Sequence, residues 1–234
     1  MQVTNKIKFS KMIFRGMLKS AKVFLIALWS LNVFSIDYVT IAGDTNARHK
    51  WTMDFNQEGT YSNMIIKDKD GIKKIRIQNE QVVSVEIFDG TRLLRRIDYN
   101  YVSKEVIVLI NQNNGTVKKE VIELEGNVWE NETMIYLIGK QKLKEGKRML
   151  FQNLNSEAVR LVEMYLENKG IETIYINGKS YDAVKYEMGL NGFFMSKLWP
   201  HKYFWWYEKS TGTFLQYKGM GEEGDIPETY ELAD

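Results

Sequence analysis

The sequence predicts a mainly β protein, in which a large antiparallel meander of about twelve strands forms an incompletely closed barrel with one short covering helix. From residue 50 onward, short runs alternate apolar and polar residues, as strands with one buried face do. Asp-Gly and Asn-Gly pairs separate several runs, and they favour tight hairpins because these residues tolerate positive φ. So large a sheet is expected to curl, since twisted open sheets rarely exceed about ten strands.

Residues 1–35 differ in composition from the rest of the chain. They carry six basic residues and no acid, and twelve uncharged residues, VFLIALWSLNVF, occupy positions 23–34. A basic region, a short apolar region and a permissive cleavage site around Val33 and Ser35 are typical of a secretory signal peptide. An amphipathic or buried helix at the start of the domain is the alternative. The apolar run is shorter than the roughly 20 residues that a membrane-spanning helix needs, so a transmembrane protein is not expected.

We therefore expect residues 1–35 to be a cleaved export signal and residues 36–234 to form a single β-rich open-barrel domain. The expected location is the periplasm, with secretion as the second choice. Without the leader, 26 basic and 30 acidic residues remain, so the mature chain is mildly acidic. A nucleic-acid partner is not expected, because it would require a basic face on the folded part.

The period-two runs and the turn signals between them place the strands. Strands are expected at 50–55, 60–67, 72–78, 81–88, 92–99, 104–110 and 116–124, and again at 147–152, 158–167, 171–176, 180–188, 202–208, 213–218 and 228–232.

One segment, 131–140 (NETMIYLIGK), breaks this rhythm and predicts a short helix. Asn131 can cap its N-terminus and Gly139 can end it. The apolar side chains of this helix are expected to pack across the sheet, because the apolar face of a helix must be buried against another element.

The segment 203–207 (YFWWY) is the densest aromatic run in the chain. As a strand it places Tyr203, Trp205 and Tyr207 on one face and the intervening aromatics on the other. The returning strand is expected to place Phe214 and Gln216 together on one face. One face would pack under the helix and the other would line the barrel interior, as core or as the wall of an apolar ligand site.

The preceding segment, 192–204, is rich in aromatic residues and Met and reads as a long loop. Phe194 and Trp199 lie in it, and such residues are common in contact surfaces and lids. We expect a flap over the barrel mouth, or a patch that recognises a protein. The predicted ligand-binding residues are therefore Tyr203, Trp205, Tyr207, Phe214, Phe194 and Trp199.

No motif in the chain indicates catalysis or metal binding. There is no cysteine and there are two histidines about 150 positions apart, so no zinc or iron site and no cofactor is expected. No G-x-S-x-G elbow or phosphate-binding glycine loop is present. Glu222 and Glu223 are adjacent acids, which usually form a solvated loop rather than an acid–base pair or a calcium site.

Three segments carry a resemblance to a known family. Residues 131–152, 170–187 and 205–219 resemble parts of bacterial exported proteins of unknown function and of periplasmic lipoprotein carriers with a LolA-like fold. The resemblance implies an open β-barrel with helix cover and a role in carrying acylated lipoproteins or lipid-like molecules. It brings no catalytic residues.

These observations predict a non-enzymatic periplasmic protein that binds a hydrophobic or lipid-like molecule in its concave interior. The alternative is a structural or protein-interaction module of the cell envelope, whose barrel is filled with side chains and whose partner is an envelope protein. A third class, an envelope hydrolase, would require an activated Ser or a shifted carboxylate in a cleft.

Overall fold

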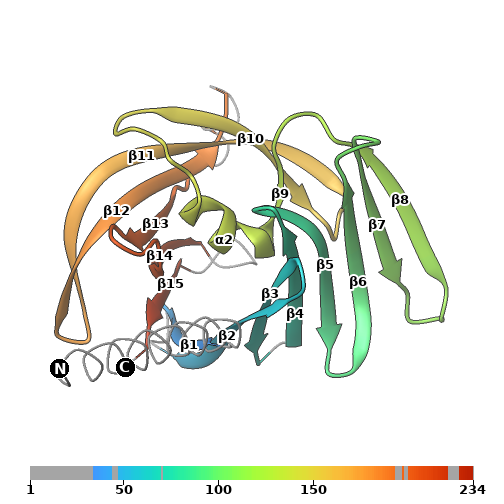
Figure 1. Ribbon diagram of the computed structural model, residues 1–234, viewed down its shortest axis with the longest axis horizontal. Coiled ribbons are helices and arrows are strands. Elements are labelled where there is room, and N and C mark those ends of the chain that lie inside the picture. Colours follow the sequence, from blue (N-terminus) through green and yellow to red (C-terminus); the bar gives the residue numbers. More distant parts are fainter. Residues whose placement is uncertain are drawn as a thin grey trace, which may run out of the picture.

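The architecture is one highly curved sheet with a short helix on its concave side (Figure 1). The computed structural model describes residues 34–43, 47–69, 71–192, 197, 200–220 and 227–233. All strands among them belong to one sheet of fifteen strands, in place of about twelve. The mainly β, largely antiparallel class predicted from period-two runs is confirmed.

The strands of the first half are β1 (Phe34–Ala42), β2 (Arg48–Glu58), β3 (Tyr61–Asp68), β4 (Gly71–Gln78), β5 (Gln81–Asp89), β6 (Arg92–Asn100), β7 (Glu105–Asn111) and β8 (Val117–Glu123). After β9 (Val128–Glu130) come the 3-10 helix η1 (Asn131–Thr133) and the α-helix α2 (Met134–Gly139). The second half contains β10 (Arg148–Asn155), β11 (Arg160–Ile176), β12 (Lys179–Leu190), β13 (Tyr203–Glu208), β14 (Phe214–Met220) and β15 (Pro227–Leu232).

Two antiparallel meanders make up the sheet, one from β1 to β8 and one from β10 to β15. They join where β1 pairs with β15, so that Tyr38 lies opposite Leu232. The only parallel pair among the described strands is β9 with β10. β8 and β9 are the two edges and share no backbone ladder, so the sheet is not closed by hydrogen bonds.

Three details of the strand prediction are wrong. β1 and β9 lie where no strand is expected from the sequence. The expected strands 158–167 and 171–176 are one strand, β11, with a bulge between Asn168 and Ile171. The turn-like residues there form the bulge: Gly170 has φ +96°, and its N–H donates to Asn168 Oδ1 at 2.7 Å.

The predicted helix forms, but its cap and its position differ from expectation. Glu130, rather than Asn131, caps η1, because its carboxylate accepts a hydrogen bond from the Glu132 N–H at 2.8 Å. α2 lies on the concave side, so the helix and the barrel interior occupy the same face of the sheet (Figure 1). The expectation of a helix on one face and an interior on the other is therefore wrong.

Side chains rather than backbone pairs connect the two meanders across the open seam. Arg95 on β6 donates to Ser156 Oγ at 2.8 Å, and Ser156 donates to the buried Glu130 carboxyl at 3.1 Å. Lys73 on β4 pairs with Glu132 at 2.9 Å. Burial and the nearby Glu132 carboxylate raise the pKa of Glu130 to about 8.

Candidate functional site

The candidate site is the aromatic lining that β1, β2 and β13–β15 present to the concave side. A bulge in the β13–β14 pair creates part of it. Trp205 pairs with Tyr217 and Tyr207 pairs with Phe214, so β14 holds one more residue than β13 over this interval. As a result Phe214 and Tyr217 both face the interior core, and the predicted grouping of Phe214 with Gln216 is wrong.

Six aromatic side chains form a closed ring of successive contacts, which we call the aromatic ring cluster. Its members, in order of contact, are Tyr38, Trp51, Tyr230, Tyr217, Trp205 and Phe214. Their ring centroids are 4.5–6.0 Å apart, from the Tyr38–Trp51 stack to the edge-on Trp51–Tyr230 contact. The pairing of β1 with β15 brings together residues that lie almost 200 positions apart in the chain.

Three phenol groups in and around this cluster donate to backbone carbonyls. Tyr38 Oη donates to the Phe214 carbonyl at 3.1 Å, and Tyr217 Oη donates to the Met220 carbonyl at 2.9 Å. Tyr207 Oη donates to the Ile135 carbonyl of α2 at 2.9 Å, which fastens the helix to β13. Burial raises the pKa of all three tyrosines, so they remain neutral hydrogen-bond donors.

The two indole N–H groups of the aromatic ring cluster are not satisfied. Trp51 is 8% exposed and Trp205 is 7% exposed, and neither Nε1 has a hydrogen-bond partner within the part of the chain that the structure describes. A buried donor without an acceptor costs about 1–3 kcal/mol. The cluster therefore offers two donors to a molecule that carries acceptor oxygens.

The opposite, convex face of the same strands is organised differently. Trp206 is also buried, but its Nε1 donates to Glu172 at 2.6 Å. Lys185 pairs with Glu172 at 3.3 Å and lies over the Trp206 ring at 5.1 Å from its centroid. The Trp206 N–H and the Lys185 ammonium group therefore both have a partner on this face.

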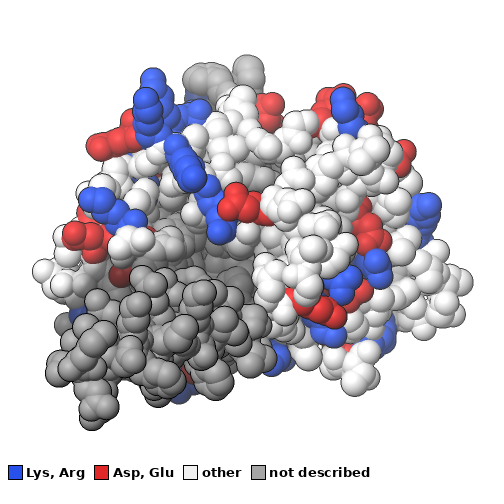
Figure 2. All heavy atoms as spheres, viewed as in Figure 1, with Lys and Arg blue, Asp and Glu red and all other residues white. Residues whose placement is uncertain are grey.

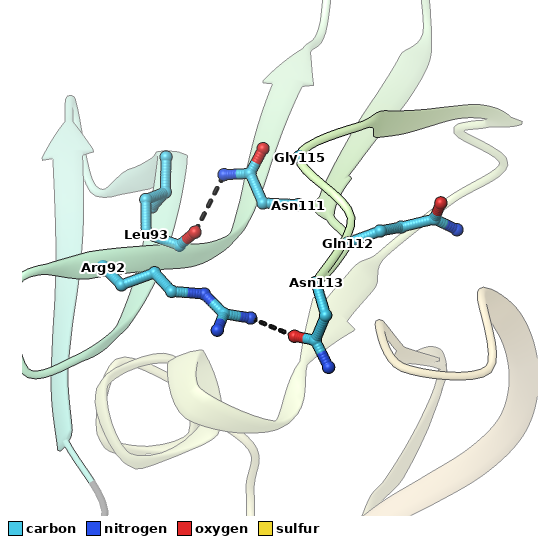
Figure 3. A pocket seen from close by; sticks show the side chains of 6 residues that line it. All are labelled: Arg92, Leu93, Asn111, Gln112, Asn113 and Gly115. Carbon is cyan, nitrogen blue, oxygen red and sulfur yellow. Dashed lines mark hydrogen bonds between the residues drawn. The ribbon is translucent and has the colours of Figure 1, made fainter.

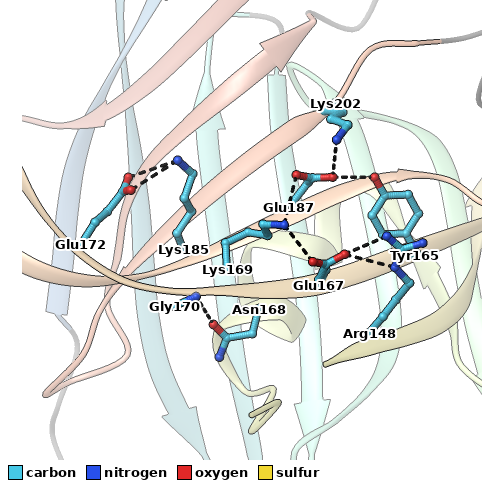
Figure 4. Close-up of polar contacts among 10 residues, drawn as sticks. All are labelled: Arg148, Tyr165, Glu167, Asn168, Lys169, Gly170, Glu172, Lys185, Glu187 and Lys202. Carbon is cyan, nitrogen blue, oxygen red and sulfur yellow. Dashed lines mark hydrogen bonds and ion pairs between the residues drawn. The ribbon is translucent and has the colours of Figure 1, made fainter. Parts of the chain in front are cut away.

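Farther along the convex face, a polar network surrounds the buried carboxylate of Glu187 (Figure 4). It accepts hydrogen bonds from Tyr165 Oη and Lys202 Nζ, both at 2.7 Å. Burial raises the pKa of Tyr165 to about 12, and the adjacent Glu187 adds to that rise. Burial opposes ionisation of Glu187, but the bonds from Lys202 and Tyr165 outweigh it and lower the pKa of this carboxyl.

The structure brings together four of the predicted site residues. Trp205, Tyr207 and Phe214 are buried on the concave side, and Tyr203 packs against the same core. The other two, Phe194 and Trp199, lie outside the described residues, as do all of residues 193–196 and 198–199 of the proposed flap.

Four members of the aromatic ring cluster were missed as site residues: Tyr38, Trp51, Tyr217 and Tyr230. Tyr217 faces the interior core because of the bulge between β13 and β14. Tyr38 lies in a segment for which no strand was expected. Trp51 and Tyr230 lie in predicted strands. Tyr230 meets the run at 203–207 through the pairing of β14 with β15, and Trp51 meets it through the pairing of β1 with β15. The alternation within each strand could show that they are inward-facing, although it could not show what they contact.

A surface recess lies elsewhere, where the chain turns into β6 and out of β7 (Figure 3). It has a volume of about 380 Å³ and is lined by Arg92, Leu93, Asn111, Gln112, Asn113 and Gly115. Arg92 Nη2 donates to Asn113 Oδ1 at 2.5 Å, and Asn111 Nδ2 donates to the Leu93 carbonyl at 2.8 Å. Its polar groups already bond to each other, which makes it a weaker candidate than the aromatic ring cluster.

Within the described ranges, no group of three or more His, Asp or Glu side chains is placed to hold a metal ion. No helix within the same ranges has the length and apolar character needed to cross a membrane.

Comparison with known proteins adds one structural similarity. No protein-family model matches the chain, and no curated protein matches it. Among solved structures, the hypothetical lipoprotein YmcC from Escherichia coli (K12) is similar at 14% sequence identity and a TM-score of 0.37. The match covers 95% of this chain and 94% of that protein.

Proposed function

We propose that this protein is a non-enzymatic, periplasmic, LolA-like binding protein for a hydrophobic or lipid-like molecule, which it holds against the aromatic ring cluster. The observation that carries the proposal is the pair of buried, unpartnered indole N–H groups of Trp51 and Trp205. The basic, acid-free composition of residues 1–35 supports export.

The chemistry of the cluster defines the ligand class. Contact with aromatic rings contributes about 25 cal/mol per Å² of apolar surface removed from water. The two indole N–H groups would donate to ester, carboxyl or hydroxyl oxygens of the ligand, which fixes its orientation. An amphiphile with an acyl chain and a few oxygens meets both requirements, whereas a pure hydrocarbon would leave both N–H groups unsatisfied.

A second candidate function, a side-chain-filled module that binds an envelope protein, is favoured by the position of α2. Met134 and Ile138 of this helix are buried in the same core as the aromatic ring cluster. A Cβ added to Gly139 would lie 2.8 Å from Tyr207 Cε1, so the helix packs tightly on β13. The two candidates differ in whether a molecule can reach the two indole groups.

Native mass spectrometry separates these functions. The full chain would be expressed with export and purified without harsh detergent, and the sample would then be extracted with organic solvent. A stoichiometric adduct that extracts as a lipid or fatty acid supports the binding function. A clean apo mass, together with no uptake of a fluorescent fatty acid, would favour the filled module.

Matched tryptophan variants test the site itself. Trp51→Phe and Trp205→Phe each remove one N–H that has no partner among the described residues. We expect either variant to weaken fatty-acid uptake by about 5- to 30-fold, because each loses one hydrogen bond to the charged or polar head of the fatty acid. Trp206→Phe is the control, because its N–H bonds to Glu172 on the convex face. Equal weakening in all three variants would exclude the aromatic ring cluster as the site.

A further inference from the structure

The segment that joins α2 to β10 concentrates positive charge on an otherwise mildly acidic chain. Residues 140–148 read KQKLKEGKR and contain five basic residues and one acid. All five basic side chains are exposed. Figure 2 shows Lys and Arg side chains along the path that this segment follows between α2 and β10 in Figure 1. We call residues 140–148 the basic segment.

Hydrogen bonds hold the backbone of the basic segment in place. Tyr186 Oη donates to the Gln141 carbonyl at 2.9 Å, and Asn168 Nδ2 donates to the Leu143 carbonyl at 2.6 Å. The Gly146 N–H donates to the Asn168 carbonyl at 2.8 Å. The segment is thus anchored to β11 and β12 at three points, and its lysines project from a fixed base.

Three of the lysines have no counter-charge. Lys142, Lys144 and Lys147 form no ion pair with any acid among the described residues. The single acid of the segment, Glu145, is turned back against the protein, since a Cβ added to Gly170 would lie 2.8 Å from its Oε1. Arg148 differs, because it pairs with Glu167 at 2.7 Å.

An apolar side chain lies beside this charge. Leu150 follows Arg148 by two residues on β10, which places the two on the same face of the strand. Leu150 is 51% exposed. Exposed Lys and Arg next to an exposed large apolar residue are typical of surfaces that lie against lipid headgroups.

We propose that the basic segment docks this protein on the surface of an anionic lipid bilayer. The lysines are exposed point charges on flexible stems and surround no pocket with buried polar groups. Such a set fits many mobile headgroups better than one fixed anion, which would be bound by converging donors. The proposal does not depend on the ligand of the aromatic ring cluster, because docking requires only the outer surface.

Vesicle co-sedimentation tests the proposal with the full chain. Vesicles of phosphatidylcholine alone would be compared with vesicles that contain equal amounts of phosphatidylcholine and phosphatidylglycerol. We expect binding to the anionic vesicles only, and a loss of binding as salt rises, because exposed charges are screened within about 10 Å at 0.1 M ionic strength.

A charge-matched pair of double variants locates the surface. Lys142→Gln/Lys144→Gln should weaken binding to anionic vesicles about 30-fold. Each lysine near the surface contributes a factor of roughly ten or less to the affinity, and the two factors multiply. Lys118→Gln/Lys119→Gln changes the net charge equally on the exposed edge strand β8 and should weaken binding by less than about 3-fold. Thermal unfolding would verify that both variants fold.

Three outcomes would overturn the proposal. They are equal binding to neutral and anionic vesicles, no binding at low salt, and equal weakening by the two double variants. Inorganic phosphate gives a further test. Release by phosphate that exceeds release by chloride at the same ionic strength would indicate a site for a single anion and would also overturn it.

Discussion

Trp205 and Trp206 are adjacent in the sequence, and the two faces of β13 treat them differently. Both are buried, at 7% and 5% exposure. On the convex face, Trp206 has a carboxylate acceptor and a lysine over its ring. On the concave face, Trp205 packs against Tyr217 and Phe214, and its N–H has no acceptor among the described residues. The indole N–H on the convex face therefore has a partner within the protein, whereas the indole N–H on the concave face has none among the described residues.

This difference separates a structural surface from a candidate binding surface. Buried polar groups in folded proteins nearly always have partners, so unpartnered ones call for an explanation. Two such N–H groups lie within one aromatic cluster, and neither has a partner among the described residues, which is why the proposed function rests on them.

Truncation of the two tryptophans should give the largest effect. Trp205→Ala is expected to lower the free energy of unfolding by about 3–5 kcal/mol, because it leaves a cavity among the rings of Tyr217 and Phe214. Trp206→Ala should cost about 1–2 kcal/mol less, since the Lys185 side chain can collapse into the space. Denaturant unfolding measures both. Equal losses would mean that the faces do not differ in packing.

A buried carboxyl at the open seam between the two meanders gives the next effect. Glu130 has a raised pKa of about 8, against 4.5 in the unfolded chain. The folded state therefore binds its proton more tightly, and this contribution to stability is complete below pH 4.5 and is lost as pH rises through 8. Glu130→Gln stays neutral, so it should be more stable than the wild type at pH 9, by up to about 4 kcal/mol.

Thermal unfolding across the pH range measures that difference. The gap between Glu130→Gln and the wild type should widen from pH 5 to pH 9. A constant gap would show that the pKa of Glu130 in the folded protein is not raised above its value in the unfolded chain.

The contact between α2 and the concave face is tested by Gly139→Ala. In an exposed helix this change is stabilising by about 1 kcal/mol. Here we expect a loss of about 1–3 kcal/mol, because the new methyl group would meet the Tyr207 ring. Tyr207→Leu should relieve that clash, so the double variant should lose less than the sum of the single variants. If the losses of the two single variants simply added, position 139 of α2 would not contact the Tyr207 ring.

Replacement of each tryptophan by phenylalanine gives a smaller and sharper comparison. Trp206→Phe and Trp205→Phe delete the same ring atoms, but only Trp206→Phe deletes a hydrogen bond. Without ligand, Trp206→Phe should therefore be less stable than Trp205→Phe by about 1–3 kcal/mol. Denaturant midpoints of the two ligand-free variants give the difference. If Trp205→Phe were equally destabilised, its N–H would have a partner.

The smallest effect is expected for Glu187 on the convex face. The bonds from Lys202 and Tyr165 lower its pKa, so its contribution is present above the unfolded pKa and is lost as pH falls through the lower, folded value. Glu187→Gln should lower stability at pH 7 and flatten the loss on acidification. This acid dependence is opposite in sign to that of Glu130. If Glu187→Gln lost stability on acidification as steeply as the wild type, thermal unfolding across the pH range would contradict this prediction.

Local features of the sequence were sufficient for the class, the hairpins and the helix. Asn177 and Gly178 both have positive φ, as the predicted tight turn requires. The alternation in 203–207 correctly separates Trp205 from Trp206, because side chains in a strand point to opposite faces. These features depend on neighbouring residues alone, so they can be read from the chain.

The remaining features depend on contacts between distant residues. The bulge that brings Phe214 and Tyr217 to one face arises from the register between two strands, and no residue of β14 marks it. The position of α2 inside the curve follows from where the sheet bends. The aromatic ring cluster requires the pairing of β1 with β15.

A β-rich chain with an aromatic strand whose two faces both need cover can be read from the order of the residues. The folded sheet then gives one face polar partners at Glu172 and Lys185 and closes the other into a ring of aromatic side chains, in which two N–H donors have no acceptor among the described residues. The physical reason is that alternation fixes the direction of a side chain, whereas hydrogen-bond satisfaction depends on which distant groups the folded sheet brings within about 3 Å.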